Sequence, residues 1–527
     1  MHRLSTAATT ALLFLAHGPA GAQGQAPEGY DAIHAQYKRY RTTEPLAIRT
    51  IGRERLASTG DPRALEILID DFSSPESPKQ VVRHLLASVT TRHFAGADSV
   101  ERLAEWREEH DKPLDAWLWL RTLKIDAEQA GPEASLAVIQ DRKASIYHKA
   151  AALEALARCE DPKGLYGAVA LVMENLPKKP YEKAVLVGGM ATALEHRQGK
   201  IHDRAYKSSL SYFIHLLDEE YGLETDTKLV IARHLGRILN TDELVINSAP
   251  WVAKLADTSK KVTRGSEAEY VRPTFFGVEA TGSRICYVID MSDSMCKPVD
   301  APGRGAEEDS IVLDQVETRF DLAREHLKLS LRQLGKDKSF AVVYFGDQAG
   351  LLDSCKGMVK ATPGNVKKVI KELDSIETDK PTEMRPDGRL RGKTNLHGGL
   401  RSAFRVQKKG LVDEGSYVDL DVFAEGADTI FLLSDGRPSW DDYEAWDVDY
   451  GEFTIGDPES GQKGGGGNRM HYGGPYRDTK HLLEDVERLN AFRELEIHCI
   501  AIGREAPRQL LQKIADLGHG KLHELAD

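Results

Sequence analysis

The chain changes its hydrophobic periodicity near residue 257, and this change constrains its fold more than any other feature. Over residues 42–257, apolar side chains recur at the spacing of helices that bury one face. Over residues 277–527, short runs rich in β-branched residues alternate with helical stretches. Residues 258–276 follow neither pattern and are predicted to be a linker. A chain of 527 residues is also too long for one core, so we expect separate domains.

The first half is predicted to be all-helical. Asp61 and Pro62 look like an N-cap and a first helical residue, and the same pair returns at Asp161 and Pro162. The apolar stripes that follow are Leu65, Leu68, Ile69 and Phe72 in the first copy and Leu165, Ala168, Val169 and Val172 in the second. The segment GDPRALEILIDDF resembles the second helix of HEAT-type repeats, which stack into solenoids. A compact irregular bundle is the alternative. This half shows no catalytic motif, so we expect a scaffold or a partner-binding surface.

The second half is predicted to be a doubly wound α/β sheet, because strands and helices alternate along it. The expected strands are residues 284–290, 340–345, 429–433 and 497–502, with an edge strand starting at residue 520. Ligands of such sheets bind where the parallel strands end. The ends of these strands are therefore the first place to look for function.

Oxygen-bearing side chains gather at these predicted ends. Asp290, Ser292 and Ser294 form a D-x-S-x-S array as the first strand ends, and Asp435 follows the end of another strand. Thr394 lies just before a predicted helix. Carboxylate and hydroxyl oxygens suit Mg²⁺ or Ca²⁺ better than zinc or copper. Because Asp435 lies at a strand end outside the core, we expect its removal to leave the metal-free protein folded.

This pattern resembles the metal-ion-dependent adhesion site of von Willebrand factor type A domains. The resemblance covers residues 276–527 and includes the order of the strands and the DGRP segment at residues 435–438. It implies that Ser292, Ser294 and Thr394 bind a divalent cation directly, while Asp290 and Asp435 act largely through ordered water. Mg²⁺ is the first expectation, with Mn²⁺ and Ca²⁺ as alternatives. One coordination position would remain for an acidic group of a protein partner.

Some features depart from the family pattern. Asp293 stands where the family usually has glycine, and Cys296 is expected to be an inert, partly buried thiol, with a redox-sensitive one as the alternative. Three segments near the predicted site are enlarged: residues 298–310, 377–392 and 439–477. The last is acidic and then glycine-rich. Together they are either a recognition surface or lid, or solvated insertions.

The N-terminus is predicted to be a signal peptide, residues 1–22. A basic start precedes a short apolar run, and Ala20-Gly21-Ala22 supplies the small residues that a signal peptidase recognises. The run is about half as long as a membrane span. We therefore expect an exported protein (periplasmic, cell-surface or secreted) without stable membrane insertion after cleavage. A net charge of −12 argues against sequence-independent nucleic-acid binding.

These patterns favour an exported, metal-dependent protein-binding module joined to a helical scaffold. A metal-assisted hydrolase is an alternative, in which His397 or His471 would approach the site. A subunit of a larger assembly, similar to type A domain components that work with ATPases, is another. The chain has no G-x-x-x-x-G-K-[ST] motif and would not supply the nucleotide site itself. The partner's identity and the oligomeric state stay open.

Overall fold

The first half of the chain is an array of helices. The computed structural model describes residues 29–41, 45–74, 80–262, 273–299, 316–447 and 470–525. The helices of the first half are α1 (Tyr30–Tyr40), α2 (Leu46–Ala57), α3 (Pro62–Ser73), α4 (Gln80–His93), α5 (Val100–Glu108), α6 (Ala116–Gln129), α7 (Glu133–Gln140), α8 (Ile146–Leu156), α9 (Lys163–Glu174), α10 (Pro180–His196), α11 (Arg204–His215), α12 (Thr225–Leu239) and α13 (Ser248–Ala256). Residues 1–22, the predicted signal peptide, lie outside the described residues.

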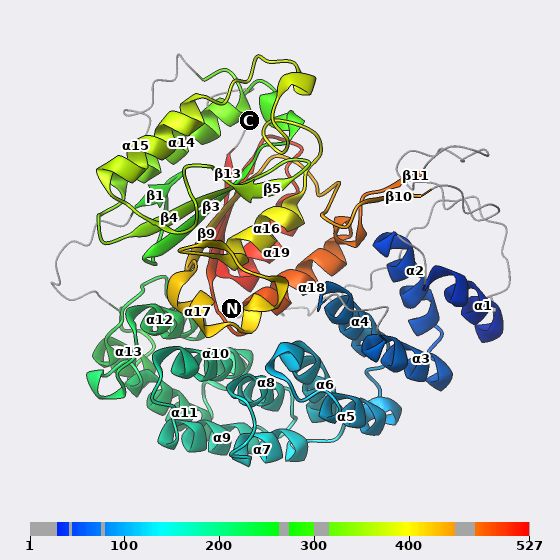
Figure 1. Ribbon diagram of the computed structural model, residues 1–527. Coiled ribbons are helices and arrows are strands. Elements are labelled where there is room, and N and C mark those ends of the chain that lie inside the picture. Colours follow the sequence, from blue (N-terminus) through cyan, green and yellow to red (C-terminus); the bar gives the residue numbers. More distant parts are fainter. Residues whose placement is uncertain are drawn as a thin grey trace, which may run out of the picture.

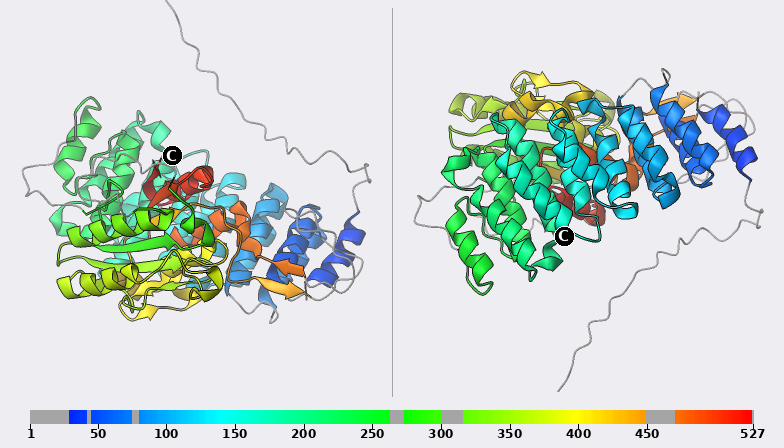
Figure 2. Two further views of the ribbon diagram at one scale, coloured as in Figure 1. Left: turned by 90° about the horizontal axis from the view of Figure 1, so that it is seen from above. Right: turned by 90° about the horizontal axis from the view of Figure 1, so that it is seen from below.

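These helices form two layers. From α2 to α12, each even-numbered helix packs on the next even-numbered one, while α3, α5, α7, α9, α11 and α13 lie outside them. The array curves beneath the second half of the chain, and its even-numbered layer faces that half (Figures 1 and 2). Each helix pair leaves an apolar face that only its neighbours cover. The first half therefore fits a helical repeat.

The helix start predicted at Asp61 and Pro62 is confirmed, whereas the second helix begins one residue later than predicted, with Pro162 at the N-cap and Lys163 as its first residue. The Asp61 carboxylate accepts a hydrogen bond from the Arg63 amide (2.9 Å), and Asp161 accepts one from the Lys163 amide (3.0 Å). The eight apolar residues of the two predicted stripes are all buried. The spacing of apolar residues was sufficient here because each helix buries one continuous face.

The second half is a doubly wound α/β fold, as predicted. Its seven-stranded sheet, as far as the structure describes it, has the order β13-β12-β9-β3-β4-β5, with β6 also paired to β4. The strands are β3 (Arg284–Asp290), β4 (Ser339–Phe345), β5 (Ala349–Leu351), β6 (Val359–Lys360), β9 (Thr429–Ser434), β12 (Glu496–Ile502) and β13 (His519–Leu525). The first five in that order are parallel, whereas β5 and β6 are antiparallel.

Helices cover both faces of this sheet. They are α14 (Arg319–Gln333), α15 (Pro363–Asp374), α16 (Leu396–Arg405), α17 (Leu420–Glu425), α18 (Thr479–Asn490) and α19 (Arg508–Leu517). Apolar residues of α14 and α15 pack on one face, and those of α16, α18 and α19 pack on the other. Three hairpins were not predicted: β1 (Thr274–Phe275) with β2 (Val278–Glu279), β7 (Val406–Gln407) with β8 (Gly410–Leu411), and β10 (Ala445–Asp447) with β11 (Met470–Tyr472). Strands of two or three residues are too short to show periodicity.

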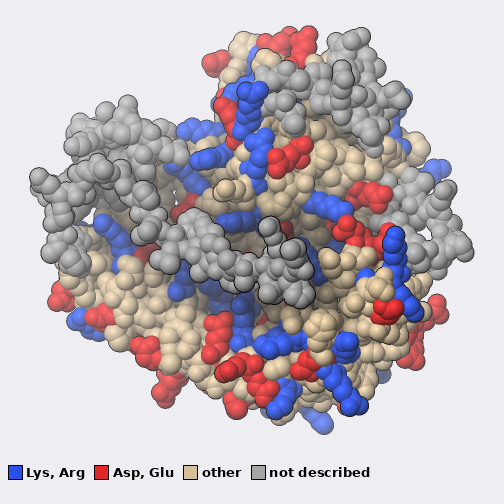
Figure 3. Space-filling view, turned by 180° about the vertical axis from the view of Figure 1, so that it is seen from behind, with Lys and Arg blue, Asp and Glu red and all other residues tan. Residues whose placement is uncertain are grey.

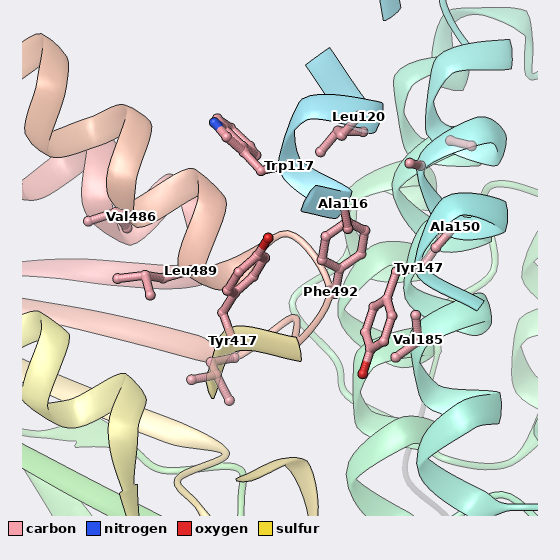
Figure 4. Packing of buried hydrophobic residues seen from close by; sticks show 14 of the residues in the cluster. Ala116, Trp117, Leu120, Tyr147, Ala150, Val185, Tyr417, Val486, Leu489 and Phe492 are labelled. Atoms are coloured by element: carbon pink, nitrogen blue, oxygen red, sulfur yellow. The ribbon is translucent and has the colours of Figure 1, made fainter. Parts of the chain in front are cut away.

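One hydrophobic core joins the two halves. Phe492, in the turn after α18, packs edge-on against Tyr147 of α8, with 5.5 Å between the ring centroids (Figure 4). The Tyr147 hydroxyl donates to the Val418 carbonyl (2.7 Å), and the Tyr417 hydroxyl donates to the Leu114 carbonyl (2.5 Å). The predicted boundary at residues 258–276 stays a prediction. The shared core nevertheless leads us to expect that the two halves unfold together, because each half buries part of its apolar surface against the other.

The outer surface carries charges of both signs. On the face in Figure 3, basic and acidic side chains both occur across the described residues. Among the described residues, no helix is both long and apolar enough to cross a membrane. The charges on this face do not mark a functional site, so we turn to the carboxyl edge of the sheet.

Candidate metal centre

Three loops meet where the parallel strands end. Asp290 is the last residue of β3, and the loop after it carries Ser292 and Ser294. Asp435 is the residue after β9, and Thr394 precedes α16. Backbone hydrogen bonds join the loops. The Met291 amide donates to the Phe345 carbonyl of β4 (2.6 Å), and the Arg391 amide donates to the Met291 carbonyl (3.1 Å). Sheet topology thus brings together residues 145 positions apart in the chain, such as Asp290 and Asp435.

Four of the five predicted residues form one chain of polar contacts. The Ser292 amide donates to Asp290 Oδ1 (2.9 Å), and the Ser292 and Ser294 hydroxyl oxygens are 2.9 Å apart. The Ser294 hydroxyl donates to Asp435 Oδ1 (2.7 Å). Both carboxylates are fully buried. These oxygens are therefore held close together at the end of the sheet.

Thr394 reaches the same place from another side. A Cβ atom added to Gly436 would lie 3.2 Å from Thr394 Oγ1 and 3.7 Å from Ser294 Oγ. Both hydroxyls thus lie beside Gly436, and a side chain there would crowd Thr394. The Thr394 loop is fixed by Ser439, whose hydroxyl accepts from the Thr394 amide (3.1 Å).

Arg319, the first residue of α14, is a site residue that the sequence did not reveal. Its guanidinium donates to Asp435 Oδ2 (2.6 Å), and both side chains are buried. A basic residue at a helix start has no distinctive spacing, so the sequence carried no usable signal. Asp435 is thus buried and paired, and we expect Asp435→Ala to weaken the metal-free protein, because that change leaves a buried arginine without its carboxylate.

One comparison with known proteins bears on the fold that carries these residues. Residues 310–445 and 470–524 match the model of a family described as the von Willebrand factor type A domain. The C-terminal half contains a type A domain. Thr394 and Asp435 lie within the matched residues, whereas Asp290, Ser292 and Ser294 precede them. A comparison of the chain with curated proteins finds no match.

The donor set of this type A domain fits a hard divalent cation. It consists of two carboxylates and three hydroxyls, without nitrogen or sulfur. Burial, and then the charge of Asp435, raises the pKa of Asp290 to about 7. Hydrogen bonds from Ser292 and Ser434 oppose this increase. A divalent cation would relieve the repulsion between the two carboxylates, whereas the Arg319 guanidinium on Asp435 already offsets part of it.

Cation binding to the type A domain should weaken as the pH falls below about 7. A cation needs the ionised Asp290, and a proton competes once the pH is below the pKa of about 7. We expect the apparent Kd for Mn²⁺ to rise about five- to tenfold for each pH unit below 7. In the metal-free protein, stability depends on pH in the opposite direction. The raised pKa of Asp290 stabilises the fold at low pH, and this contribution is lost as the pH rises through 7. Titrations monitored by melting temperature at several pH values measure both effects.

The two departures from the family pattern turn away from the cluster. Asp293 is exposed, and its Oδ1 lies 3.6 Å from Nη1 of Arg385 in the enlarged segment 377–392. The same guanidinium contacts Cys296 Sγ (3.2 Å). Burial raises the pKa of the Cys296 thiol, although Arg385 acts in the opposite direction. A protonated, half-buried thiol is a poor nucleophile, which favours the inert alternative.

The ends of the acidic insertion 439–477 are anchored. Asp441 is fully buried and accepts from the amides of Tyr443 and Tyr476, each at 2.7 Å. Asp442 accepts from the Asn395 amide group (2.6 Å) and from Arg401 (3.1 Å), both on the α16 segment that follows Thr394. These two acidic residues are therefore structural. Residues 448–469, with the remaining acidic and glycine-rich part, lie outside the described residues, as do 300–310 of the first enlarged segment.

The histidines of the hydrolase alternative have partners elsewhere. His397 is buried, lies 2.9 Å from Asp485 Oδ2 of α18, and stacks on Tyr476. His471 contacts Glu444 (2.5 Å) and stacks on Trp440. Both rings thus pair with carboxylates outside the Asp290 cluster. The geometry adds no support for a general base at the type A site.

Proposed function

We propose that this protein captures an acidic group of a protein partner through a divalent cation bound at the carboxyl edge of its sheet. Ser292, Ser294 and Thr394 would hold the cation directly, and Asp290 and Asp435 would hold it largely through water. Mg²⁺ is the first expectation for the cation, which would accept the partner's carboxylate as a ligand. The observation that carries this proposal is the continuous polar chain from Asp290 through both serines to Asp435.

The position of the helical array supports this choice of surface. Its even-numbered layer packs against the chain's own type A domain, so that layer is not free for a partner. The carboxyl edge of the sheet, by contrast, bears the oxygen cluster and the enlarged segments. We therefore place partner capture at the metal edge and give the helical array the role of a support.

Affinity capture tests the proposal. Wild-type protein and Asp290→Asn are immobilised and exposed to an Asp- and Glu-containing peptide library in Mg²⁺, in Mn²⁺ and in chelator. We expect wild type to retain acidic peptides only with a cation, and the variant to retain none. C-terminally amidated peptides with Asn and Gln in place of Asp and Glu are the matched control, since they lack every carboxylate. Retention that is equal in chelator would contradict the proposal.

We also propose that the protein is exported and that its mature chain begins at Gln23. The support is the basic start, apolar run and Ala20-Gly21-Ala22 pattern of residues 1–22. Intact-mass measurement of protein from the native host's exported fraction should show the mass of residues 23–527. Material that retains residues 1–22 would argue against cleavage.

A further inference from the structure

A second cluster of metal-type ligands lies where the helical array meets the sheet. Glu195 comes from α10, His234 from α12 and His519 from the start of β13. Each offers one ligand atom, and these atoms lie within 4.8 Å of one another. The cluster shares no residue with the oxygen-only site described above.

The atoms of this cluster are buried and contact one another without the geometry of hydrogen bonds. Only 1% of the His234 side chain is exposed, and its Nδ1 lies 2.7 Å from Glu195 Oε2, yet neither ring nitrogen has a hydrogen-bond partner of acceptable geometry. The same holds for Glu195 Oε2 and His519 Nδ1. Burial lowers the pKa of His234, but Glu195 and Glu494 outweigh burial and raise it to about 9, so a metal ion would have to displace a proton from this ring. Native proteins seldom leave buried polar atoms poorly paired, and a ligand that these atoms share would satisfy them.

The distances suit a tetrahedral metal ion. Glu195 Oε2 is 2.7 Å from His234 Nδ1 and 3.7 Å from His519 Nδ1. Ligand atoms about 2.1 Å from a tetrahedral Zn²⁺ lie about 3.4 Å from one another. The two distances from Glu195 Oε2 lie on either side of this value, and all three ligand atoms lie within 4.8 Å of one another, so small side-chain shifts would let them contact one ion. Two imidazoles and one carboxylate are ligands that favour Zn²⁺ over Mg²⁺ or Ca²⁺.

Glu494 occupies the place of an orienting group. Its Oε2 lies 3.4 Å from His234 Nε2 and 3.6 Å from His519 Nε2, on the nitrogens that face away from Glu195. Its other oxygen accepts from the Thr192 hydroxyl (2.8 Å). A carboxylate on the far ring nitrogen of a metal-bound histidine fixes the ring and its tautomer. Both rings can thus present Nδ1 to a shared ion.

We propose that Glu195, His234 and His519 bind a Zn²⁺ ion that fastens the helical array to the edge of the sheet. The ion would join two helices of the first half to the last strand of the second. A cavity of about 380 Å³, lined also by Lys124 and His196, adjoins the cluster. It gives the ion an entry path and leaves the fourth position to water.

The test measures Zn²⁺ binding by the full-length chain in the Asp290→Asn background, which removes the proposed oxygen site from the measurement. Protein stripped by a chelator is titrated with Zn²⁺ and, separately, with Co²⁺. We expect one equivalent of Zn²⁺ after gel filtration and a rise in Tm of about 3 °C at 100 times the Kd. Co²⁺ should give the visible spectrum of a tetrahedral site with nitrogen ligands.

Matched variants identify the ligands. His519→Gln and Glu195→Gln should each weaken Zn²⁺ binding at least a hundredfold. His196→Gln, which changes a histidine that lines the same cavity but is not in the cluster, should leave binding unchanged. Circular dichroism checks that each variant is folded. If the ligand variants fail to fold, the Co²⁺ spectrum of the parent protein decides whether the metal has a tetrahedral site with nitrogen ligands.

Two results would overturn the proposal. Absence of bound Zn²⁺ together with an octahedral, oxygen-type Co²⁺ spectrum would mean that the histidines hold a proton between two carboxylates instead of a metal. Loss of Zn²⁺ in His196→Gln, or full retention in His519→Gln, would mean that the ligands are others. Neither result bears on the oxygen site, since that site is absent from the protein tested.

Discussion

Replacing Asp290 by asparagine is expected to abolish stabilisation by Mg²⁺ or Mn²⁺ without weakening the metal-free protein. In wild type, a cation at 100 times its Kd should stabilise the fold by about 2.7 kcal/mol, or about 3 °C in Tm. Asparagine keeps the shape of Asp290: its carbonyl oxygen can accept from the Ser292 amide, and its NH₂ group can donate to the Ser434 hydroxyl, which donates to Asp290 in wild type. It removes a charge that burial and Asp435 oppose, so the metal-free variant should be as stable as wild type or slightly more stable. Differential scanning calorimetry with cation and with chelator measures both quantities.

Asp435→Ala is the informative contrast. It should also lose the response to cations, but the metal-free protein should lose about 3–5 kcal/mol, because Arg319 remains buried without its partner. Adding Arg319→Met should recover most of that loss, since an apolar side chain needs no partner. A wild-type protein that shows no response to millimolar Mg²⁺, Mn²⁺ or Ca²⁺ would contradict the cation site. An Asp290→Asn variant that still responds would place the cation elsewhere.

Phe492→Ala should destabilise the whole chain by about 3–5 kcal/mol, or about 3–5 °C in Tm. Phe492 is 2% exposed and lies between Tyr147 of the helical array and Tyr417 of the type A domain (Figure 4). Because one core spans both halves, calorimetry should show a single transition that shifts as a unit. Tyr212→Ala is the matched control, since Tyr212 is 56% exposed on α11 and should change stability by less than about 0.5 kcal/mol.

The number of transitions decides between one cooperative unit and two. If two transitions appear and only one moves in Phe492→Ala, the halves unfold independently and the shared core is weaker than its burial indicates. A single transition that does not move would mean that the site relaxes around the missing ring.

The elements that could be predicted from the sequence are those with long, one-sided apolar patterns. The strand 284–290 was predicted to the residue, and the α3 stripe from Leu65 to Phe72 is buried as expected. The hairpin β10–β11 escaped prediction because strands of three residues have no period. The candidate oxygen residues were visible because D-x-S-x-S and Asp435 each follow a strand, and parallel strands end at one edge.

The amino-acid sequence by itself determined the two kinds of periodicity, and with them a helical half and a doubly wound α/β half. It also determined which oxygen-bearing residues stand at the strand ends, since local patterning decides where a strand stops. Only the tertiary structure decided that Arg319 pairs with Asp435, that Phe492 packs against Tyr147, and that His234 meets His519. Those contacts join residues hundreds of positions apart or lie between separate elements. Periodicity reports the face that an element buries, but it carries no information on which other element covers that face.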